Sequence, residues 1–143
     1  MILLDVNVLL AAHREDHPHH PTVRPWLDGM VAGDENFSVP DSVWVSFIRI
    51  STNRRIFGVP TPLDEAFAFL NALRAQPGYL AIGPAAGSLK LFERVCKGSE
   101  AVGDLAPDAY LAVLAMEQGA TLVSLDRDFA RFPELRWRLP AAG

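Results

Sequence analysis

Residues 107–126 read Pro-Asp-Ala-Tyr-Leu-Ala-Val-Leu-Ala-Met-Glu-Gln-Gly-Ala-Thr-Leu-Val-Ser-Leu-Asp, a helix-like segment that leads directly into a strand-like one. Pro107 suits the first turn of a helix, and Gly119 suits its end. The run from Ala120 to Leu125 is short and apolar enough for a buried strand, and Asp126 closes it. Helix, short turn and strand make half of a βαβ unit, so this stretch predicts a parallel sheet with helices on its faces.

A second apolar run, Met1 to Leu4, is closed by Asp5 with no turn residue before it. In an open parallel sheet the carboxyl ends of the strands face the crevice where ligands bind. We therefore expect Asp5 and Asp126 to share one pocket, although they lie at opposite ends of the chain. Carboxylates gathered in this way indicate a divalent metal ion.

Helical and strand patterns alternate through the rest of the chain, as an α/β protein requires. The helix that ends near Ala32 is expected to begin with Thr22 as its cap and to stop at Gly33. The expected helices are residues 7–12, 22–32, a segment opened by 40–42, one that begins at 61 or 62 and stops at 77–78, 86–96, and 108–118; the expected strands are 1–4, 37–39, 79–82 and 121–125.

The chain has 143 residues, half of them hydrophobic, which suits one domain with a single core. We expect the domain to cover residues 1–139 and residues 140–143 to form a flexible tail. The first residues do not resemble a signal peptide, and no segment is long enough to span a membrane. With Cys96 as the one cysteine, the sequence favours a cytoplasmic protein.

The net charge of −4 argues against a protein that holds nucleic acid through a broad basic face. A nuclease stays possible, because a bound metal ion would neutralise its acidic residues. Arg49, Arg54 and Arg55 form a local positive group. They are candidates for contacts with RNA phosphates, or they are the polar side of a helix and its exit.

Two further acids extend the candidate site. Asp108 lies in the first turn of its helix, where the macrodipole stabilises a carboxylate, so it either supports the helix end or joins the pocket. Asp128 follows Asp126 by two residues, a spacing that is also common in turns. Mg²⁺ or Mn²⁺ prefers such oxygen ligands and could activate water against a phosphodiester. No protein nucleophile is evident in the sequence.

Three stretches together resemble the PIN-domain ribonucleases of the VapC toxin family: residues 3–10, residues 47–57, and residues 107–112 continued by 121–133. The resemblance covers nearly the whole chain. It implies a compact three-layer α/β/α domain with a central, mainly parallel sheet. It also implies a Mg²⁺- or Mn²⁺-dependent endoribonuclease of a type II toxin–antitoxin system, a homodimer, and a VapB antitoxin that blocks the site.

Carried over by position, Asp5, Asp108 and Asp126 match the metal-binding acids of that family. Asp128 matches an often acidic neighbour, and Asn7 matches the polar residue that commonly orients the first acid. Ser124 stands where the family usually has Thr or Ser.

One position departs from the family pattern. The family usually carries a glutamate inside the helix after its second strand, and residues 43–47 contain no acid. Asp41, about one helical turn earlier, is the nearest candidate for a replacement. A lost ligand also leaves open a non-catalytic module that binds RNA or protein.

A zinc site and a phosphatase fit the sequence less well. His13, His17, His19 and His20 match no common zinc spacing, so a solvated loop is the preferred interpretation. A phosphatase of the aspartyl-phosphate type would place a second Asp two residues after Asp5, where this sequence has Asn7.

Overall fold

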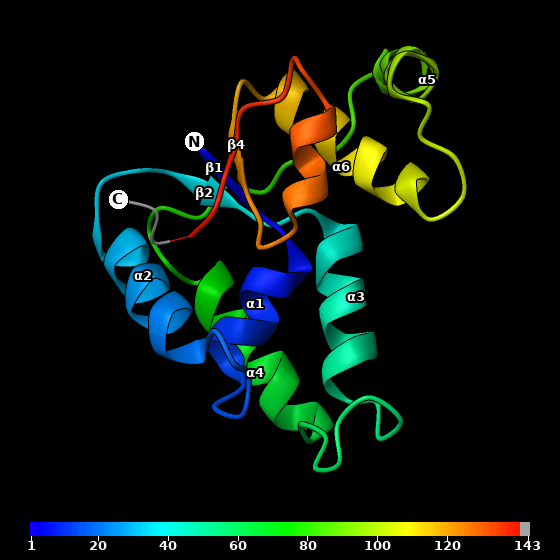
Figure 1. Cartoon of the computed structure of the whole chain (residues 1–143). Coiled ribbons are helices and arrows are strands. Elements are labelled where there is room, and N and C mark those ends of the chain that lie inside the picture. The colour runs from blue at the N-terminus through cyan, green and yellow to red at the C-terminus, as the bar shows by residue number, and fades with distance from the viewer. Residues whose placement is uncertain (141–143) are drawn as a thin grey trace.

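The computed structural model describes residues 1–140 of the chain (Figure 1). Within these residues a four-stranded sheet is combined with six α-helices and one 3₁₀ helix. In chain order the elements are β1 (Ile2–Leu4), α1 (Val6–His13), α2 (His20–Ala32), β2 (Phe37–Ser38), α3 (Asp41–Ser51), α4 (Leu63–Arg74), α5 (Ser88–Ser99), α6 (Leu105–Glu117), β3 (Thr121–Val123), η1 (Arg127–Arg131) and β4 (Trp137–Arg138).

The sheet has the strand order β2-β1-β3-β4, and every pair in it is parallel. Leu3 of β1 is in register with Ser38 of β2 on one side and with Leu122 of β3 on the other. The chain therefore leaves β1 in one direction and returns on its other side. This reversal makes the carboxyl ends of β1 and β3 the switch point where open α/β sheets bind ligands.

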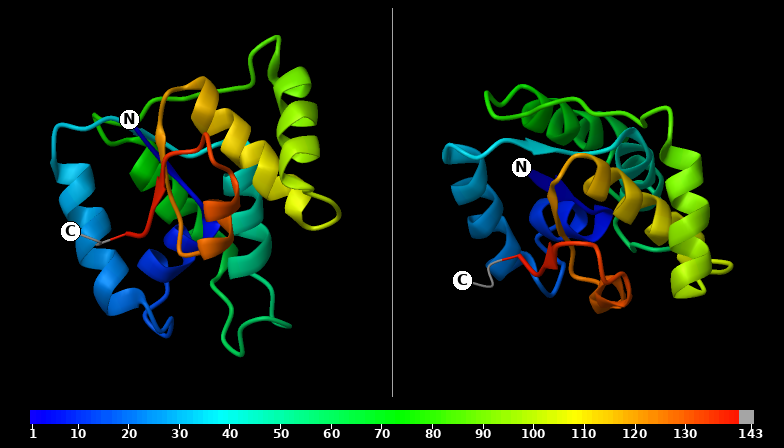
Figure 2. Two further views of the ribbon diagram at one scale, coloured as in Figure 1. Left: turned by 45° about the horizontal axis from the view of Figure 1, so that its top comes forward. Right: turned by 90° about the horizontal axis from the view of Figure 1, so that it is seen from above.

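The central strands β1 and β3 are short and apolar because both of their faces are covered. All three residues of β1 are buried, without the alternation of a strand that has one face in water. Figures 1 and 2 show α5 and α6 gathered at one end of the molecule and α1 to α4 grouped around the other. Contacts between α1 and both α2 and α3, and between α5 and α6, hold these two groups together. The predicted α/β/α fold is confirmed.

The strand predicted at 79–82 is wrong. Tyr79 makes a single bridge to Phe37, and Leu80 is 43% exposed. The segment lies beside the edge strand β2, and among the described residues its one backbone bond to that strand runs from Leu80 N–H to Phe37 O; the neighbouring bond, from Phe37 N–H, goes to Gly78 O just before the segment. An apolar run of four residues predicts a strand only if a neighbour covers it, and here solvent takes that place.

The predicted beginning of α2 is also wrong. The helix begins at His20 rather than at Thr22, and no side chain caps it. Pro21 occupies its first turn, where a missing N–H costs nothing, so the helix extends through the proline that seemed to end the loop. Helix α5 is likewise displaced, to Ser88–Ser99 from the predicted 86–96, and β4 was not predicted.

The predicted flexible tail falls mainly on residues 141–143, which lie outside the described residues; Pro140 is a buried turn residue. Within residues 1–140 no helix combines the length and apolar character needed to cross a membrane.

Two glycines should respond to alanine in opposite directions. Gly119 ends α6 with φ +59°, a left-handed conformation that a Cβ disfavours, so Gly119→Ala should lower the free energy of unfolding by about 1 kcal/mol. Gly29 lies within α2 with open space around it, so Gly29→Ala should raise the free energy of unfolding by about 0.5–1 kcal/mol. Urea unfolding checks both, and equal changes of one sign would contradict the assignment.

Candidate metal centre

Asp5 lies directly after β1 and begins α1. Its backbone N–H still pairs with Val123 O of β3 at 3.1 Å, so the residue belongs to both the sheet and the helix. Its Oδ1 accepts from the backbone N–H of Val6 at 2.7 Å, as an N-cap carboxylate does. Asp5 is 8% exposed, and it is the one buried acid among the described residues.

Ser124 connects Asp5 to the end of β3. Its hydroxyl, fully buried, donates to Asp5 Oδ2 at 2.7 Å. Ser124 Oγ also accepts from Asn7 Nδ2 at 3.0 Å and from the backbone N–H of Asp126 at 3.0 Å. One serine hydroxyl therefore joins residues 5, 7 and 126 into a network across the two central strands.

Asn7 completes this network. Its Nδ2 donates to Asp5 Oδ2 at 3.2 Å, and its Oδ1 accepts from the backbone N–H of Leu125 at 2.9 Å. That last bond takes the Leu125 amide away from the sheet and explains why β3 ends at Val123 rather than at the predicted 125. Both the donor and the acceptor of the Asn7 amide are therefore used to hold Asp5 and the end of β3 in place.

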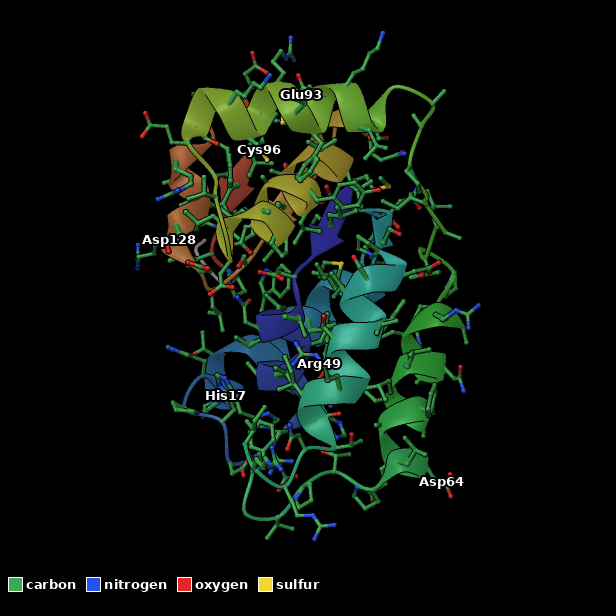
Figure 3. All side chains as sticks on the ribbon, turned by 90° about the vertical axis from the view of Figure 1, so that its right-hand side faces the viewer. His17, Arg49, Asp64, Glu93, Cys96 and Asp128 are labelled. Carbon is green, nitrogen blue, oxygen red and sulfur yellow. The ribbon has the colours of Figure 1, made fainter. Side chains whose placement is uncertain are left out.

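Asp126 and Asp128 begin η1. Asp126 Oδ1 accepts from the backbone N–H of Asp128 at 2.9 Å, which caps the 3₁₀ helix and fixes the Asp126 carboxylate. Asp126 is partly buried and Asp128 is exposed. Figure 3 shows Asp128 on the side of the molecule where α6 and η1 lie.

Asp108, in the first turn of α6, shares the electrostatic environment of the other acids. Its pKa is raised to about 6, first by burial and then by the negative charges of Asp5, Asp126 and Asp128. Arg131 acts in the opposite direction. Burial also raises the pKa of Asp5, and the charge of Asp126 adds to this, while hydrogen bonds from Ser124, Val6 and Asn7 oppose it.

The four acids lie near one another, but they do not form a closed cage. In residues 1–140 no three His, Cys, Asp or Glu side chains are placed so that they could hold one metal ion together. The donors nevertheless fit Mg²⁺ or Mn²⁺, because all are carboxylate oxygens and such ions keep several waters with one or two carboxylates. Burial and, after it, repulsion from the neighbouring acids raise the pKa of Asp108, and a divalent cation would relieve that repulsion.

Asp41 lies at the exposed beginning of α3 and is not among the charges that raise the pKa of Asp5 or Asp108. It lines a groove of about 690 Å³ between α3 and α4. Arg49 lines the same groove, and Arg54 and Arg55 are exposed beyond the end of α3.

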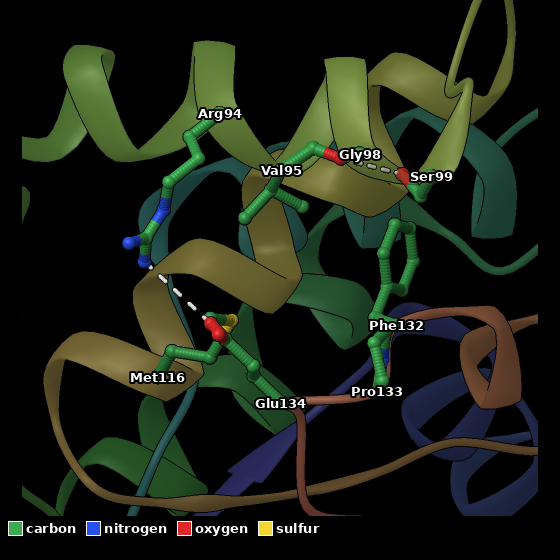
Figure 4. Close-up of a pocket in the computed structure, with 8 residues that line it drawn as sticks. All are labelled: Arg94, Val95, Gly98, Ser99, Met116, Phe132, Pro133 and Glu134. Carbon is green, nitrogen blue, oxygen red and sulfur yellow. Dashed lines mark hydrogen bonds and ion pairs between the residues drawn. The ribbon is translucent and has the colours of Figure 1, made fainter.

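A second hollow, of about 210 Å³, lies between α5, the end of α6 and residues 132–134 (Figure 4). Its polar groups already have partners: Arg94 pairs with Glu134 at 3.5 Å, and Ser99 Oγ donates to Val95 O at 2.6 Å. None of the four acids lines it, so the carboxylates remain the stronger candidate site.

The PIN-domain family description matches residues 2–135. The chain belongs to the PIN-domain family, and specifically to its VapC ribonucleases. It is 54% identical to ribonuclease VapC25 of Mycobacterium tuberculosis over 95% of this chain and 96% of that protein. It is 41% identical to ribonuclease VapC43 of the same organism, with 100% and 97% covered.

Solved structures share the PIN fold at low sequence identity. VapBC2 from Rickettsia felis, bound to a DNA fragment from its promoter, superposes with a TM-score of 0.71 at 18% identity, with 97% of this chain and 98% of that chain covered. The Mycobacterium tuberculosis toxin VapC20 superposes with a TM-score of 0.67 at 17% identity, with 95% of this chain and 99% of that chain covered.

Two residues near the PIN-domain acids were not assigned to the site from the sequence. Trp137 Nε1 donates to Ser124 O at 3.3 Å, so it supports the end of β3. Arg131 brings a positive charge near Asp108. Its place five residues after Asp126 was the available signal, since a short turn returns it to the same edge.

Ser124→Ala should lower the free energy of unfolding by about 1–3 kcal/mol at neutral pH, because the buried Asp5 carboxylate loses its hydroxyl donor. Ser38→Ala is the matched control, since Ser38 is equally buried but its hydroxyl has no partner. Urea unfolding should show little change for it. Equal losses in the two variants would mean that cavity formation, rather than the network, explains the effect.

Asp108 should make the metal-free protein less stable as the pH rises. Its folded pKa of about 6 exceeds that of an unfolded aspartate, so the folded state binds the proton more tightly and this contribution is lost between about pH 4 and pH 6. In chelator at pH 7.5, Asp108→Asn should be more stable than the parent by about 1 kcal/mol, the shift being discounted for solvent screening. The difference should vanish near pH 4.

Asp104→Asn removes the same charge one turn earlier, where the carboxylate makes no capping hydrogen bond. It should leave the pH dependence of unfolding unchanged. Parallel pH profiles for the parent and Asp108→Asn would contradict the prediction.

Proposed function

We propose that this PIN domain is a metal-dependent endoribonuclease, the toxic component of a type II toxin–antitoxin system. The observation that carries the proposal is the Asp5–Ser124–Asp126 network at the carboxyl ends of the two central strands. It gives one acid a fixed orientation and places further acids around it. The names of the curated relatives, ribonucleases VapC25 and VapC43, support RNA as the substrate.

Mg²⁺ or Mn²⁺ is proposed to bind at Asp5, Asp108 and Asp126, with one or two of these carboxylates in direct contact and the rest acting through the waters of the ion; Asp128 assists directly or through water. When bound, the metal ion would supply an activated water and stabilise negative charge on the phosphoryl group. Ser124 and Asn7 hold the Asp5 carboxylate in one orientation, as outer hydrogen-bond partners of metal ligands do. Asp41 is assigned a lesser, water-mediated role.

The remaining partners follow from the relatives and the surface charge. Neighbouring structures are those of VapBC2, VapBC-1 and FitAB, so a VapB-type antitoxin is the proposed protein partner. A homodimer is proposed from the family resemblance. Arg49, Arg54 and Arg55, exposed and without an ion pair in residues 1–140, are proposed to contact RNA phosphates.

The missing glutamate at 43–47 favours a second candidate, a PIN-like module that binds RNA or protein without cleaving it. One experiment separates the two functions. Purified protein should cleave RNA with Mn²⁺ or Mg²⁺ and lose this activity in EDTA. Asp5→Asn should lower kcat by about 100-fold or more, because it removes the best-oriented ligand.

Asp64→Asn is the control: it removes an equal charge from the exposed first turn of α4, well away from Asp128 in Figure 3, and should not change cleavage. Cleavage that survives both EDTA and Asp5→Asn in nuclease-free protein would refute the catalytic assignment. RNA binding without turnover at any metal concentration would support the non-catalytic module.

A further inference from the structure

Arg14, the residue that ends α1, is the one buried Arg or Lys among residues 1–140, at 7% exposed. Burying a guanidinium is costly unless its charge is paired and its donors are satisfied. The sequence places it beside a polar, histidine-rich stretch, where it would be expected in solvent. Its burial therefore needs a structural reason.

The contacts of Arg14 supply that reason. Its Nε and Nη2 donate to the two carboxylate oxygens of Asp16, at 2.9 and 2.7 Å. Nη1 donates to Thr61 Oγ1 at 3.1 Å, and Nη2 also donates to Val59 O at 2.7 Å. The guanidinium carbon lies 3.7 Å from the centroid of the Phe57 ring. Three of these partners belong to the segment between α3 and α4, so Arg14 fastens that segment to α1.

Residues 52–62, which connect α3 to α4, form a basic loop. Phe57 and Thr61 face Arg14, whereas Arg54 and Arg55 are exposed. No acidic residue lies between Asp41 and Asp64, although the chain as a whole has a net charge of −4. The outer side of the basic loop is therefore positive, and Arg14 itself adds nothing to it because Asp16 neutralises its charge.

The basic loop is connected to the acids by α3, whose 11 residues span about 16 Å. Figure 3 shows Arg49 on α3, lower in the view than Asp128 and to its right. Exposed arginines thus follow α3 away from the acids toward the basic loop. A polyanion matches this distribution better than a protein partner does, since arginine recognises phosphate and residues 42–63 carry Arg49, Arg54 and Arg55 but no acid.

We propose that Arg14 is a positioning residue, which holds the basic loop so that Arg54 and Arg55 bind the phosphate backbone of RNA at a distance from the cleavage site. This rests on the proposed function. It predicts that RNA long enough to span α3 gains affinity from the basic loop, whereas RNA that reaches only the acids does not.

The test measures RNA affinity in the Asp5→Asn background, where cleavage is suppressed. The probes are a labelled hairpin of about 30 nucleotides and a labelled oligomer of about three, since a strand advances by about 3.4 Å per nucleotide. Arg54→Ala/Arg55→Ala should weaken hairpin binding about ten-fold and reduce the salt slope by about 1.4 to 1.8, since each phosphate contact contributes about 0.7 on a single strand and about 0.9 on a duplex. Oligomer binding should not change.

Arg14→Lys keeps the charge but loses the paired donors and the planar contact with Phe57. In protein with Arg54 and Arg55 intact, it should weaken hairpin binding about three- to ten-fold. In protein where both are alanine, it should weaken binding less than about two-fold, because Arg14 acts through these two arginines. Arg24→Lys, the same change at a surface pair with Asp28, should have no effect. In active protein, Arg14→Lys should raise KM for the hairpin and leave kcat unchanged.

If Arg14→Lys fails to fold, Thr61→Val removes one hydrogen bond of the same cluster and should give a smaller loss of hairpin affinity. The proposal would be overturned if Arg14→Lys weakened hairpin binding equally in protein that already lacks Arg54 and Arg55. It would also be overturned if these variants bound the hairpin normally and lost affinity only for an acidic protein partner. RNA binding that depends on the basic loop without any cleavage would uphold this inference and refute the proposed nuclease. Normal cleavage, combined with a hairpin affinity that does not change when Arg54 and Arg55 are replaced, would uphold the proposed nuclease and refute this inference.

Discussion

The hydrogen bond from the Ser124 hydroxyl to the Asp5 carboxylate is the contact on which the candidate site depends. It joins the ends of β1 and β3, which are neighbours in the sheet but 119 residues apart in sequence. The hydroxyl can make this bond only because the sheet is in register here, with Leu4 opposite Val123. Asn7 reinforces the connection from the first turn of α1 and also ends β3. The pairing of β1 with β3 therefore also fixes the orientation of the Asp5 carboxylate.

The same arrangement is electrostatically unfavourable without a cation. Burial raises the pKa of Asp5, and burial together with the charges of three neighbouring acids raises the pKa of Asp108 to about 6. A domain selected only for stability would not gather carboxylates at the end of its central strands, where apolar or paired groups cost less. The repulsion is accounted for if the acids have a function that uses their charge.

Much of this was predictable from sequence, for local reasons. Asp5 and Asp126 each follow an apolar run, and parallel strands place such residues at one edge. The sequence could not predict the strand ends, because the amide of Leu125 bonds to a side chain rather than to a strand. It predicted a strand at 79–82 because apolar character does not reveal whether a neighbour exists. Arg14 was missed for the opposite reason, since a charged residue in a polar stretch normally lies in water and its partners come from a distant loop.

The central claim is that Asp5, Asp108 and Asp126 form one divalent-metal site. It is tested most directly by titrating Mn²⁺ into isotopically labelled protein and following the paramagnetic broadening of backbone amide signals. The account predicts that amides next to the acids, those of Val6, Asn7, Leu125 and Ala109, broaden first, and that a matched titration of Asp126→Asn requires more Mn²⁺ for the same effect. Broadening centred on Asp64, on the hollow beside Arg94, or spread evenly over surface acids would contradict it.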